Sequence, residues 1–237
     1  MSFLKDKLSI FQKTELQFLK KIQEADHVYT FIFKKEADLS WKAGQHGLFT
    51  ITHKKLKDSI RPFTVASSPT EGVVKITTKV SDEQPSEFKK ALLELEEGMT
   101  ITMSGPVGSF YIKKNSPTLL MAGGIGITPF RAMVKQLVYE WHTDNQPVEI
   151  LYLDSQNTHL FKEEFDHIGR EIPIVIHYLD SRNDLYQKVD QFIATHKNNA
   201  QYFISGSKSM VESISTHLKK KDVSKQNINK DTFTGIE

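Results

Sequence analysis

The chain contains no cysteine, and this absence removes several kinds of chemistry at once. Without a thiol there is no disulfide, no thiolate nucleophile, and no iron–sulfur cluster or zinc ion held by cysteine. The nine histidines are scattered and form no HExxH pattern, so we predict no metal site. A chain without cysteine also fits a reducing compartment, and we expect a cytoplasmic protein.

Long apolar runs and a strong charge imbalance are missing as well. No stretch approaches the roughly 20 apolar residues of a membrane-spanning helix, and the N-terminus lacks the continuous apolar run of a secretory signal. The net charge of +2 is too small to favour a nucleic-acid partner. We therefore predict a protein without a transmembrane segment or a nucleic-acid partner, either a monomer or a weak dimer.

The first half of the 237 residues has the pattern of β-structure. Residues 14 to 112 contain short alternating runs rich in Thr, Val, Ile and Phe, separated by turn-like clusters, and six such runs predict an antiparallel barrel. One helix interrupts them at about Ser86 to Leu95, with Ser86 as its N-cap. The runs are TELQFLKKIQ, VYTFIFKK, GLFTITH, RPFTVASS, GVVKITTKV and MTITMSG.

In the second half the apolar residues follow a different pattern. From Ser116 the chain shows continuous apolar runs, which are typical of strands buried on both faces. Helix-like segments separate them, the first reaching about Trp141, and this βαβ repetition predicts a parallel sheet. We place the domain boundary in the KKNS stretch at 113–116, giving domains 1–113 and 114–237. The apolar runs are TLLMA, VEILYL, IPIVIHYL and AQYFISG.

A glycine turn, Gly123 to Pro129, joins the first of these runs to a helix. Glycine has no Cβ, so backbone N–H groups there can approach a pyrophosphate. Thr128 suits an N-cap and Pro129 the first helical position. A larger side chain at Gly126 should then obstruct the phosphates and leave the domain folded. The alternative is a packing turn without a ligand.

A second short run, Arg61-Pro62-Phe63-Thr64, lies in the first half. Arg61 can bind a phosphate through two parallel hydrogen bonds. Phe63, two residues on, points the same way along a strand and can cover a flat ring, while Thr64 offers a hydroxyl near that ring. The alternative is an ordinary strand in which Phe63 is core and Arg61 is a surface charge.

Together these runs resemble the ferredoxin–NADP⁺ reductase superfamily, and the resemblance covers nearly the whole chain. Eight blocks occur in the superfamily's order. The resemblance implies an FAD-binding antiparallel β-barrel followed by an NAD(P)-binding α/β domain. The blocks are AGQH at 43–46, RPFTVASSP at 61–69, ITTKV at 76–80, PSEF at 85–88, GPVGSF at 105–110, AGGIGITP at 122–129, YFISGSKSMV at 202–211 and DTFTG at 231–235.

The same resemblance implies roles for the first-half residues. Arg61, followed by Pro62, would bind the flavin pyrophosphate, Phe63 would stack on the isoalloxazine, and Thr64 would bond near N5. The remaining FAD contacts would come from Thr78, Lys79, Val80 and Ser86. Phe63 departs from the superfamily pattern, which commonly has tyrosine there; stacking survives this change, but a phenolic hydrogen bond is lost.

In the second half the resemblance implies a binding site for the nicotinamide cofactor. Its pyrophosphate would lie on the turn, and its nicotinamide half would be bordered by Ser205 and nearby residues, with Phe233 near the outer face of the flavin. Serines stand where the superfamily often has Cys-Gly-Pro. Thr64, Phe63 and Ser205 would surround the reacting atoms. The cofactor residues implied are Gly124, Gly126, Ile127, Thr128, Pro129, Ser205, Gly206, Ser207 and Met210.

Two residues give opposite indications about NADH and NADPH. Asp154 ends a predicted strand, where an acid can bond a ribose 2′-hydroxyl and repel a 2′-phosphate, which favours NADH. Arg182 follows the next predicted strand, where NADPH-type members of the superfamily often place a phosphate-binding arginine. The choice stays open, with a slight preference for NADH.

The sequence thus predicts an FAD-dependent NAD(P)H oxidoreductase that passes electrons to a ferredoxin, a flavodoxin or another redox partner, protein or small molecule. Alternatives are a reductase of free flavin or ferric siderophore, an electron-transfer subunit of a larger complex, and a non-catalytic nucleotide sensor. The basic stretch 53–57 is either a docking site for an acidic partner or a solvated hairpin.

Overall fold

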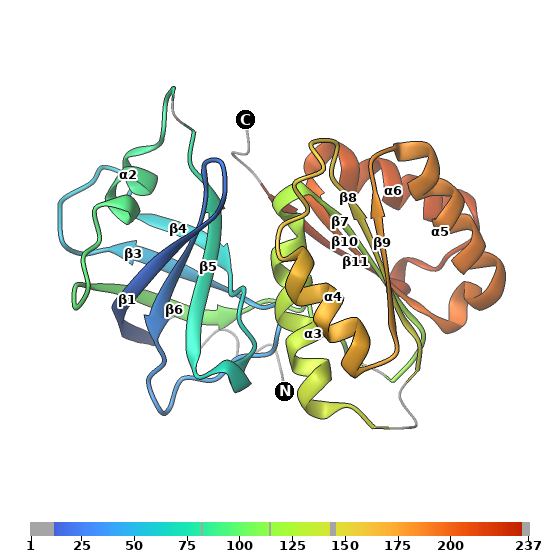
Figure 1. Ribbon diagram of the computed structural model, residues 1–237, viewed down its shortest axis with the longest axis horizontal. Helices are drawn as coiled ribbons and strands as arrows, with labels where there is room; N and C mark the ends of the chain where they lie inside the picture. Colours follow the sequence, from blue (N-terminus) through green and yellow to red (C-terminus); the bar gives the residue numbers. More distant parts are fainter. Residues whose placement is uncertain (1–11, 82, 114, 143–145, 234–237) are drawn as a thin grey trace. The chain divides into compact units, whose positions relative to one another are not determined.

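The computed structural model describes residues 12–81, 83–113, 115–142 and 146–233 (Figure 1). It divides into two compact units between Tyr111 and Ile112. The predicted boundary lies two residues further along the chain. Each unit has its own sheet and its own hydrophobic core, and each is described separately below.

The first unit is a six-stranded antiparallel sheet in the order β4-β3-β6-β1-β2-β5. The barrel-like antiparallel fold predicted for this half is confirmed. The short helix α2 (Glu87–Leu93) and a 3₁₀ turn (Pro69–Glu71) complete the unit. The strands are β1 (Lys13–Ala25), β2 (Val28–Lys34), β3 (His46–Ile51), β4 (Ile60–Thr64), β5 (Val73–Lys79) and β6 (Thr100–Val107).

Aromatic side chains build the core of this unit because the strands alternate between inward and outward positions. Phe18 of β1 meets Phe33 of β2 edge to face, with ring centroids 5.6 Å apart. Phe88 and Leu92 of α2 pack into the same core. The predicted N-cap of α2 is confirmed, since the Ser86 hydroxyl accepts the N–H of Lys89 at 3.3 Å. The helix ends at Leu93, two residues earlier than predicted.

The second unit is a parallel five-stranded sheet in the order β11-β10-β7-β8-β9, flanked by helices (Figure 1). The predicted parallel α/β domain is confirmed. Among the described residues, no helix has both the length and the apolar character needed to cross a membrane. The elements are β7 (Thr118–Gly123), α3 (Thr128–Glu140), β8 (Val148–Leu153), α4 (Lys162–Glu171), β9 (Ile174–Leu179), α5 (Arg182–His196), β10 (Gln201–Ser207), α6 (Lys208–Lys220) and β11 (Ile228–Phe233), with 3₁₀ turns at Gly124–Ile127, Lys197–Asn199 and Lys225–Asn227.

Two edge strands depart from the sequence predictions. The strand β11 was not predicted, because its sequence INKDTF has no apolar run and none of its residues is fully buried. The strand β9 was predicted to be buried on both faces, which is wrong, since Val175 is 49% exposed. Both strands pair with only one neighbour, β10 and β8 respectively, so less of each needs to be apolar.

The strand order creates a switch point between β7 and β10. From β7 the chain moves outward through β8 to β9, then returns to the other side of β7 with β10 and β11. In open parallel sheets, ligands bind where the order reverses, outside the carboxyl ends of the strands. The segments that follow β7 and β10 are therefore where a ligand is expected in this unit.

The core of the first unit gives a direct stability test. Phe49 of β3 is fully buried, whereas Ile60 of β4 is 50% exposed. We expect Phe49→Ala to lower the free energy of unfolding by about 3–5 kcal/mol, through lost burial and the cavity it leaves. Ile60→Ala should lie within about 0.5 kcal/mol of the parent, as surface substitutions usually do. Urea unfolding followed by fluorescence measures both, and equal midpoints would contradict this core.

Candidate cofactor-binding sites

The strand β4 presents Arg61 and Phe63 on one face, because alternate residues of a strand point the same way. Its pairing with β3 sets Arg61 opposite Phe49 and Phe63 opposite Gly47. The Arg61 guanidinium donates to its neighbour's carbonyl at 2.9 Å and lies 3.6 Å from the exposed carboxylate of Asp58. These contacts occupy few of its five N–H donors, so the group retains the capacity to bind a phosphate.

Phe63 belongs partly to the core and partly to the surface. Its ring meets Phe49 edge to face at 5.9 Å and lies tilted against Phe88 at 5.7 Å. The side chain is nonetheless only half-buried, while the following Thr64 is buried. A ring anchored on one side and open on the other is the arrangement that stacking on a flat ligand requires.

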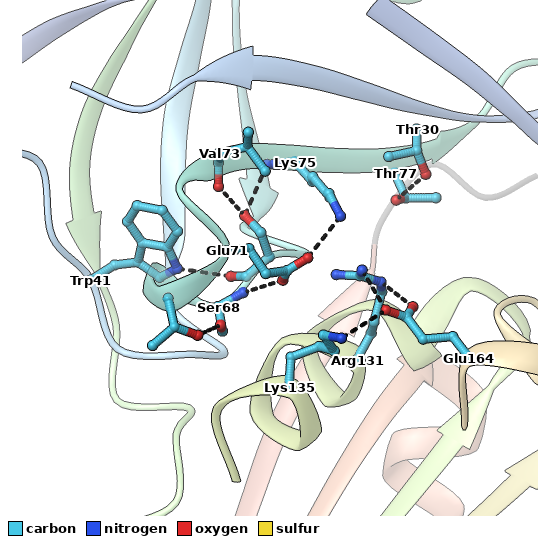
Figure 2. Close-up of polar contacts among 12 residues, drawn as sticks. Thr30, Trp41, Ser68, Glu71, Val73, Lys75, Thr77, Arg131, Lys135 and Glu164 are labelled. Carbon is cyan, nitrogen blue, oxygen red and sulfur yellow. Dashed lines mark hydrogen bonds and ion pairs between the residues drawn. The ribbon is translucent and has the colours of Figure 1, made fainter. Parts of the chain in front are cut away.

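Hydrogen bonds that the sequence did not indicate hold the segment after β4. The strand was predicted to continue to residue 68, but it ends at Thr64. The indole of Trp41 donates to the Ser67 carbonyl at 2.9 Å, and the Ser67 hydroxyl donates to the Val73 carbonyl at 2.7 Å. Lys75 and Glu71 form an ion pair at 2.7 Å nearby (Figure 2). This network fixes the chain immediately after the arginine–aromatic run.

The other predicted flavin residues lie at the end of β5 and the start of α2. Thr78 and Val80 are buried and Lys79 is exposed, while the hydroxyl of Ser86 is used as the cap of α2. Lys89, which the sequence did not single out, lies near Lys79, and burial together with the Lys79 charge lowers the pKa of Lys89. Two neighbouring ammonium groups favour an anion at this position.

In the second unit the glycine turn forms a 3₁₀ turn, Gly124–Ile127, that runs directly into α3. The prediction of Thr128 as N-cap and Pro129 as first helical residue is therefore wrong. Ile127 already has helical dihedral angles, so Thr128 is the first residue of α3 and Pro129 the second. The helical run begins at Gly124, and its unpaired N–H groups lie one turn earlier than predicted.

The two central glycines of this turn serve different purposes. Gly124 has φ +50°, and a Cβ placed on it would meet no atom within 4 Å. A Cβ on Gly126 would instead collide with the carbonyl of Ser205 and lie 2.9 Å from Cα of Gly206. The prediction that a larger residue at Gly126 leaves the domain folded did not foresee this collision, since this glycine lets the turn pack against β10.

The end of β10 brings its predicted residues to the same sheet edge. Ser205 is fully buried, and its hydroxyl has no hydrogen-bond partner in the part of the chain that the structure describes. Ser207 caps α6 by accepting the N–H of Met210 at 3.4 Å. Phe233 pairs with Ser207 at the end of β11. A buried, unpaired hydroxyl is rare and fits a polar ligand group.

Asp154 and Arg182 follow the neighbouring strands β8 and β9. The two strand ends are joined, because the N–H of Asp154 donates to the Leu179 carbonyl at 2.9 Å. The carboxylate of Asp154 accepts N–H groups from its own loop, from Gln156 at 3.1 Å and His159 at 3.0 Å. Arg182 is exposed at the start of α5. The structure thus brings both predicted selectivity residues to one edge of the sheet, where the carboxylate of Asp154 is already hydrogen-bonded to its own loop.

Sequence reasoning missed the groups that surround this loop. Tyr152 and Tyr178 flank His159, each with ring centroids 5.1 Å from the imidazole, and burial raises the pKa of both phenols. Arg131 of α3 binds both carboxylate oxygens of Glu164 in α4 at 2.7 Å (Figure 2). These residues are far apart in sequence and follow no motif, so no pattern could have joined them.

No group of histidine, aspartate and glutamate capable of holding a metal ion occurs among the described residues. Two family models match the chain. The oxidoreductase FAD-binding domain matches residues 13–112, and the oxidoreductase NAD-binding domain matches residues 120–216. Together these models match most of the chain, which belongs to the FAD- and NAD-binding oxidoreductases. It is an oxidoreductase whose cofactors are FAD and a nicotinamide nucleotide.

The curated relatives of this oxidoreductase are distant in sequence. It is 22% identical to one subunit of the Na⁺-translocating NADH-quinone reductase of Haemophilus influenzae, over 99% of this chain and 64% of that one. It is 20% identical to the flavohemoprotein of Oceanobacillus iheyensis, over 94% and 59%. The chain therefore spans less than two thirds of the length of these relatives.

Solved structures show the same fold. The ferredoxin-NADP⁺ reductase of Plasmodium falciparum matches with a TM-score of 0.77 and 18% identity, over 93% of this chain and 96% of that one. The flavohemoglobin of Malassezia yamatoensis matches with a TM-score of 0.72 and 20% identity, over 94% and 60%. At these identities the likeness shows the fold of this chain and nothing more.

The two glycines of the turn should respond differently to a single methyl group. Gly126→Ala places a Cβ against the Ser205 carbonyl, and we expect a loss of roughly 1–3 kcal/mol of stability from overpacking. Gly124→Ala costs about 1 kcal/mol through its left-handed backbone, and Gly124→Asn costs less, because asparagine tolerates that conformation. Thermal unfolding ranks the three variants. A Gly126→Ala variant as stable as Gly124→Asn would contradict the packing role.

Proposed function

We propose that this reductase oxidises NADH and passes the electrons through bound FAD to a separate acceptor. The observation that carries this proposal is the union of an FAD-binding and an NAD-binding domain in one chain. We assign residues 1–113 to the first and 114–237 to the second. Bound FAD supplies a carrier that takes up two electrons as a hydride and releases them together or singly.

On the flavin side, this proposal gives Arg61 the pyrophosphate and Phe63 one face of the isoalloxazine. The spare donors of Arg61 and the half-open ring of Phe63 support these roles. Pro62 holds the strand between them without an N–H, and Thr64 directs its hydroxyl toward N5. The residues that line the rest of FAD are Thr78, Lys79, Val80 and Ser86.

On the coenzyme side, the turn from Gly124 to Pro129 takes the nicotinamide cofactor's pyrophosphate. The open space beside Gly124 and the N–H groups at the start of the helical run support this role. Ser205 offers its unpaired hydroxyl to the nicotinamide in the same proposal. The cofactor half near the nicotinamide is bordered by Gly206, Ser207, Met210 and Phe233.

NADH is the preferred reductant in this proposal. The relatives named NADH-quinone reductase support it, as does the acid at Asp154, which disfavours a phosphate near the 2′ position. Arg182 is the residue that would favour NADPH. We also propose that the protein works in the cytoplasm, a reducing compartment with which a chain without cysteine is compatible.

The identity of the electron acceptor leads to a second candidate function. Relatives that are subunits of a larger reductase favour an electron-transfer subunit, which would deliver electrons only within a complex. A freely acting enzyme would instead reduce a ferredoxin, a flavodoxin, free flavin or a ferric siderophore. In the basic stretch 53–57, Lys54 is held by Glu94 at 2.6 Å, while Lys55 and Lys57 are exposed and available to an acidic partner.

Anaerobic reduction of the purified protein tests the proposal. The flavin absorbance should bleach with NADH faster than with NADPH, and a panel of acceptors should then restore it. Ferredoxin, flavodoxin, quinone, free flavin and ferric siderophore distinguish the candidates, and restoration only by a co-purified partner would favour the subunit. Bleaching by dithionite but by neither coenzyme would contradict the proposal.

Arg61 gives a specific test of the flavin site. Each charge-assisted hydrogen bond contributes about 1.5–3 kcal/mol, so Arg61→Ala should weaken FAD binding by at least about tenfold. Lys57→Ala is the matched control, because it removes a nearby exposed positive charge outside the motif. Fluorescence titration of the apoprotein with FAD measures both variants. Full FAD affinity in Arg61→Ala would move the pyrophosphate elsewhere.

A further inference from the structure

The strand β9 forms one outer edge of the parallel sheet, and its backbone shows which groups face outward (Figure 1). The Leu179 carbonyl accepts the Asp154 N–H at 2.9 Å, so the backbone groups of Leu179 point toward β8. Alternate residues of a strand direct these groups to opposite sides. The N–H and C=O groups of Ile176 and Tyr178 therefore point away from the sheet, and they have no hydrogen bond within the described residues.

The composition of β9 does nothing to protect this row of groups. Its sequence, IVIHYL, contains no lysine, arginine, acid, glycine or proline, and its pairing with β8 is regular along the whole strand. Burial and the nearby charge of Lys188 lower the pKa of His177, so that its ring is neutral at pH 7. Native sheets usually blunt an exposed edge with charge, proline or a bulge. The strand β9 has none of these features.

The other edge strands in the described part of the chain do carry such features. Charged side chains or a proline occur in each of them, whereas β9 has neither. Two uncharged edges can approach each other without the like-charge repulsion that lysine or arginine introduces. The strand β9 is therefore the edge whose composition permits pairing with an identical strand. The residues on the other edges are Arg61 and Pro62 in β4, Lys75 and Lys79 in β5, and Lys230 and Asp231 in β11.

Packing on both faces of the sheet holds β9 in place. On one face Leu179 packs against the core of the second unit, and Val175, on the same face, is 49% exposed. On the other face the Tyr178 hydroxyl donates to the Asp166 carboxylate of α4 at 2.7 Å. The strand is thus a fixed template with an unpaired backbone row and an exposed apolar side chain beside it.

The outward groups select one symmetric register for a second, antiparallel copy of β9. If the two-fold axis passes through His177, Ile176 of each copy faces Tyr178 of the other, and each such pair exchanges both of its hydrogen bonds. If the axis passes through Ile176, each Tyr178 faces Ile174, whose N–H is already bonded to the Ile172 carbonyl at 2.8 Å. Only the register centred on His177 pairs every outward group of Ile176 and Tyr178.

We propose that β9 pairs antiparallel with β9 of a second copy of this chain, with His177 at the two-fold axis. A second copy is the occupant because the edge is complementary to itself, in its backbone groups and in the pairing of exposed Val175 with Leu179 of the other copy. One short strand pair buries less than the roughly 1,200 Å² of a stable interface, so the dimer is weak and forms at micromolar concentrations. The pairing does not depend on the proposed function.

Because the chain has no cysteine, a single introduced cysteine reports the register. Residues at the axis form a non-hydrogen-bonded pair with Cα atoms about 4.5 Å apart, within the range of a disulfide. His177→Cys should therefore form a disulfide-linked dimer under mild oxidation. Val175→Cys is the matched control, because at about 3.3 Å per residue it lies roughly 13 Å from its copy. Non-reducing electrophoresis of the FAD-loaded full chain measures both, and equal yields of linked dimer would overturn the proposal.

Sedimentation equilibrium tests association without a crosslink. The mass of the FAD-loaded parent should rise with concentration from 27.1 kDa toward twice that value. Ile176→Pro removes an N–H that points away from β8, so the sheet should stay intact while the dissociation constant rises at least about tenfold.

Val175→Lys places a charge on the edge and should weaken association in the same way, which keeps the test decisive if Ile176→Pro fails to fold. Ile22→Lys is the matched control, because Ile22 is a comparably exposed apolar residue, 41% exposed, on another strand, and it should associate like the parent. A parent that stays monomeric at high micromolar concentration, or association undiminished in both β9 variants, would overturn the proposal. Failure of the proposed function is separately visible, as a protein that NADH does not reduce.

Discussion

The close approach of two backbones organises the coenzyme half of this reductase. Gly126 packs so tightly against the end of β10 that its turn has no room for a Cβ beside the Ser205 carbonyl. This contact joins the segment after β7 to the segment after β10, on the two sides of the switch point. The start of the helical run, the buried hydroxyl of Ser205 and the cap of α6 all take their positions from it.

The neighbouring strand ends differ in how their backbone N–H groups are paired. At Gly124 the donors lie at the start of a helical run and beside open space. After β8 the donors belong to a strained loop, and a carboxylate from the same chain satisfies them. One edge of the sheet thus carries two sets of backbone N–H groups, one beside open space and one already bonded to a side chain of the same chain.

Most helices and strands could be predicted from the sequence, because the spacing of apolar residues and the capping of helices depend on residues close together in the chain. Alternation in the first half, continuous apolar runs in the second, and the Ser86 cap all predicted the observed elements. The failures came from tertiary context. The strand β11 was missed because an edge strand needs no apolar run, and Thr128 was misplaced because a 3₁₀ turn extends the helix backward. The loop bonds of Asp154 join residues that no motif relates.

The central claim is that NADH delivers a hydride to FAD held by the same chain. Rapid anaerobic mixing of the FAD-loaded protein with NADH, carrying hydrogen or deuterium at the transferred C4 position, tests it most directly. We expect the flavin absorbance to be lost in a single turnover and deuterium to slow this loss. Flavin that stays oxidised with NADH, while dithionite reduces it fully, would contradict the account.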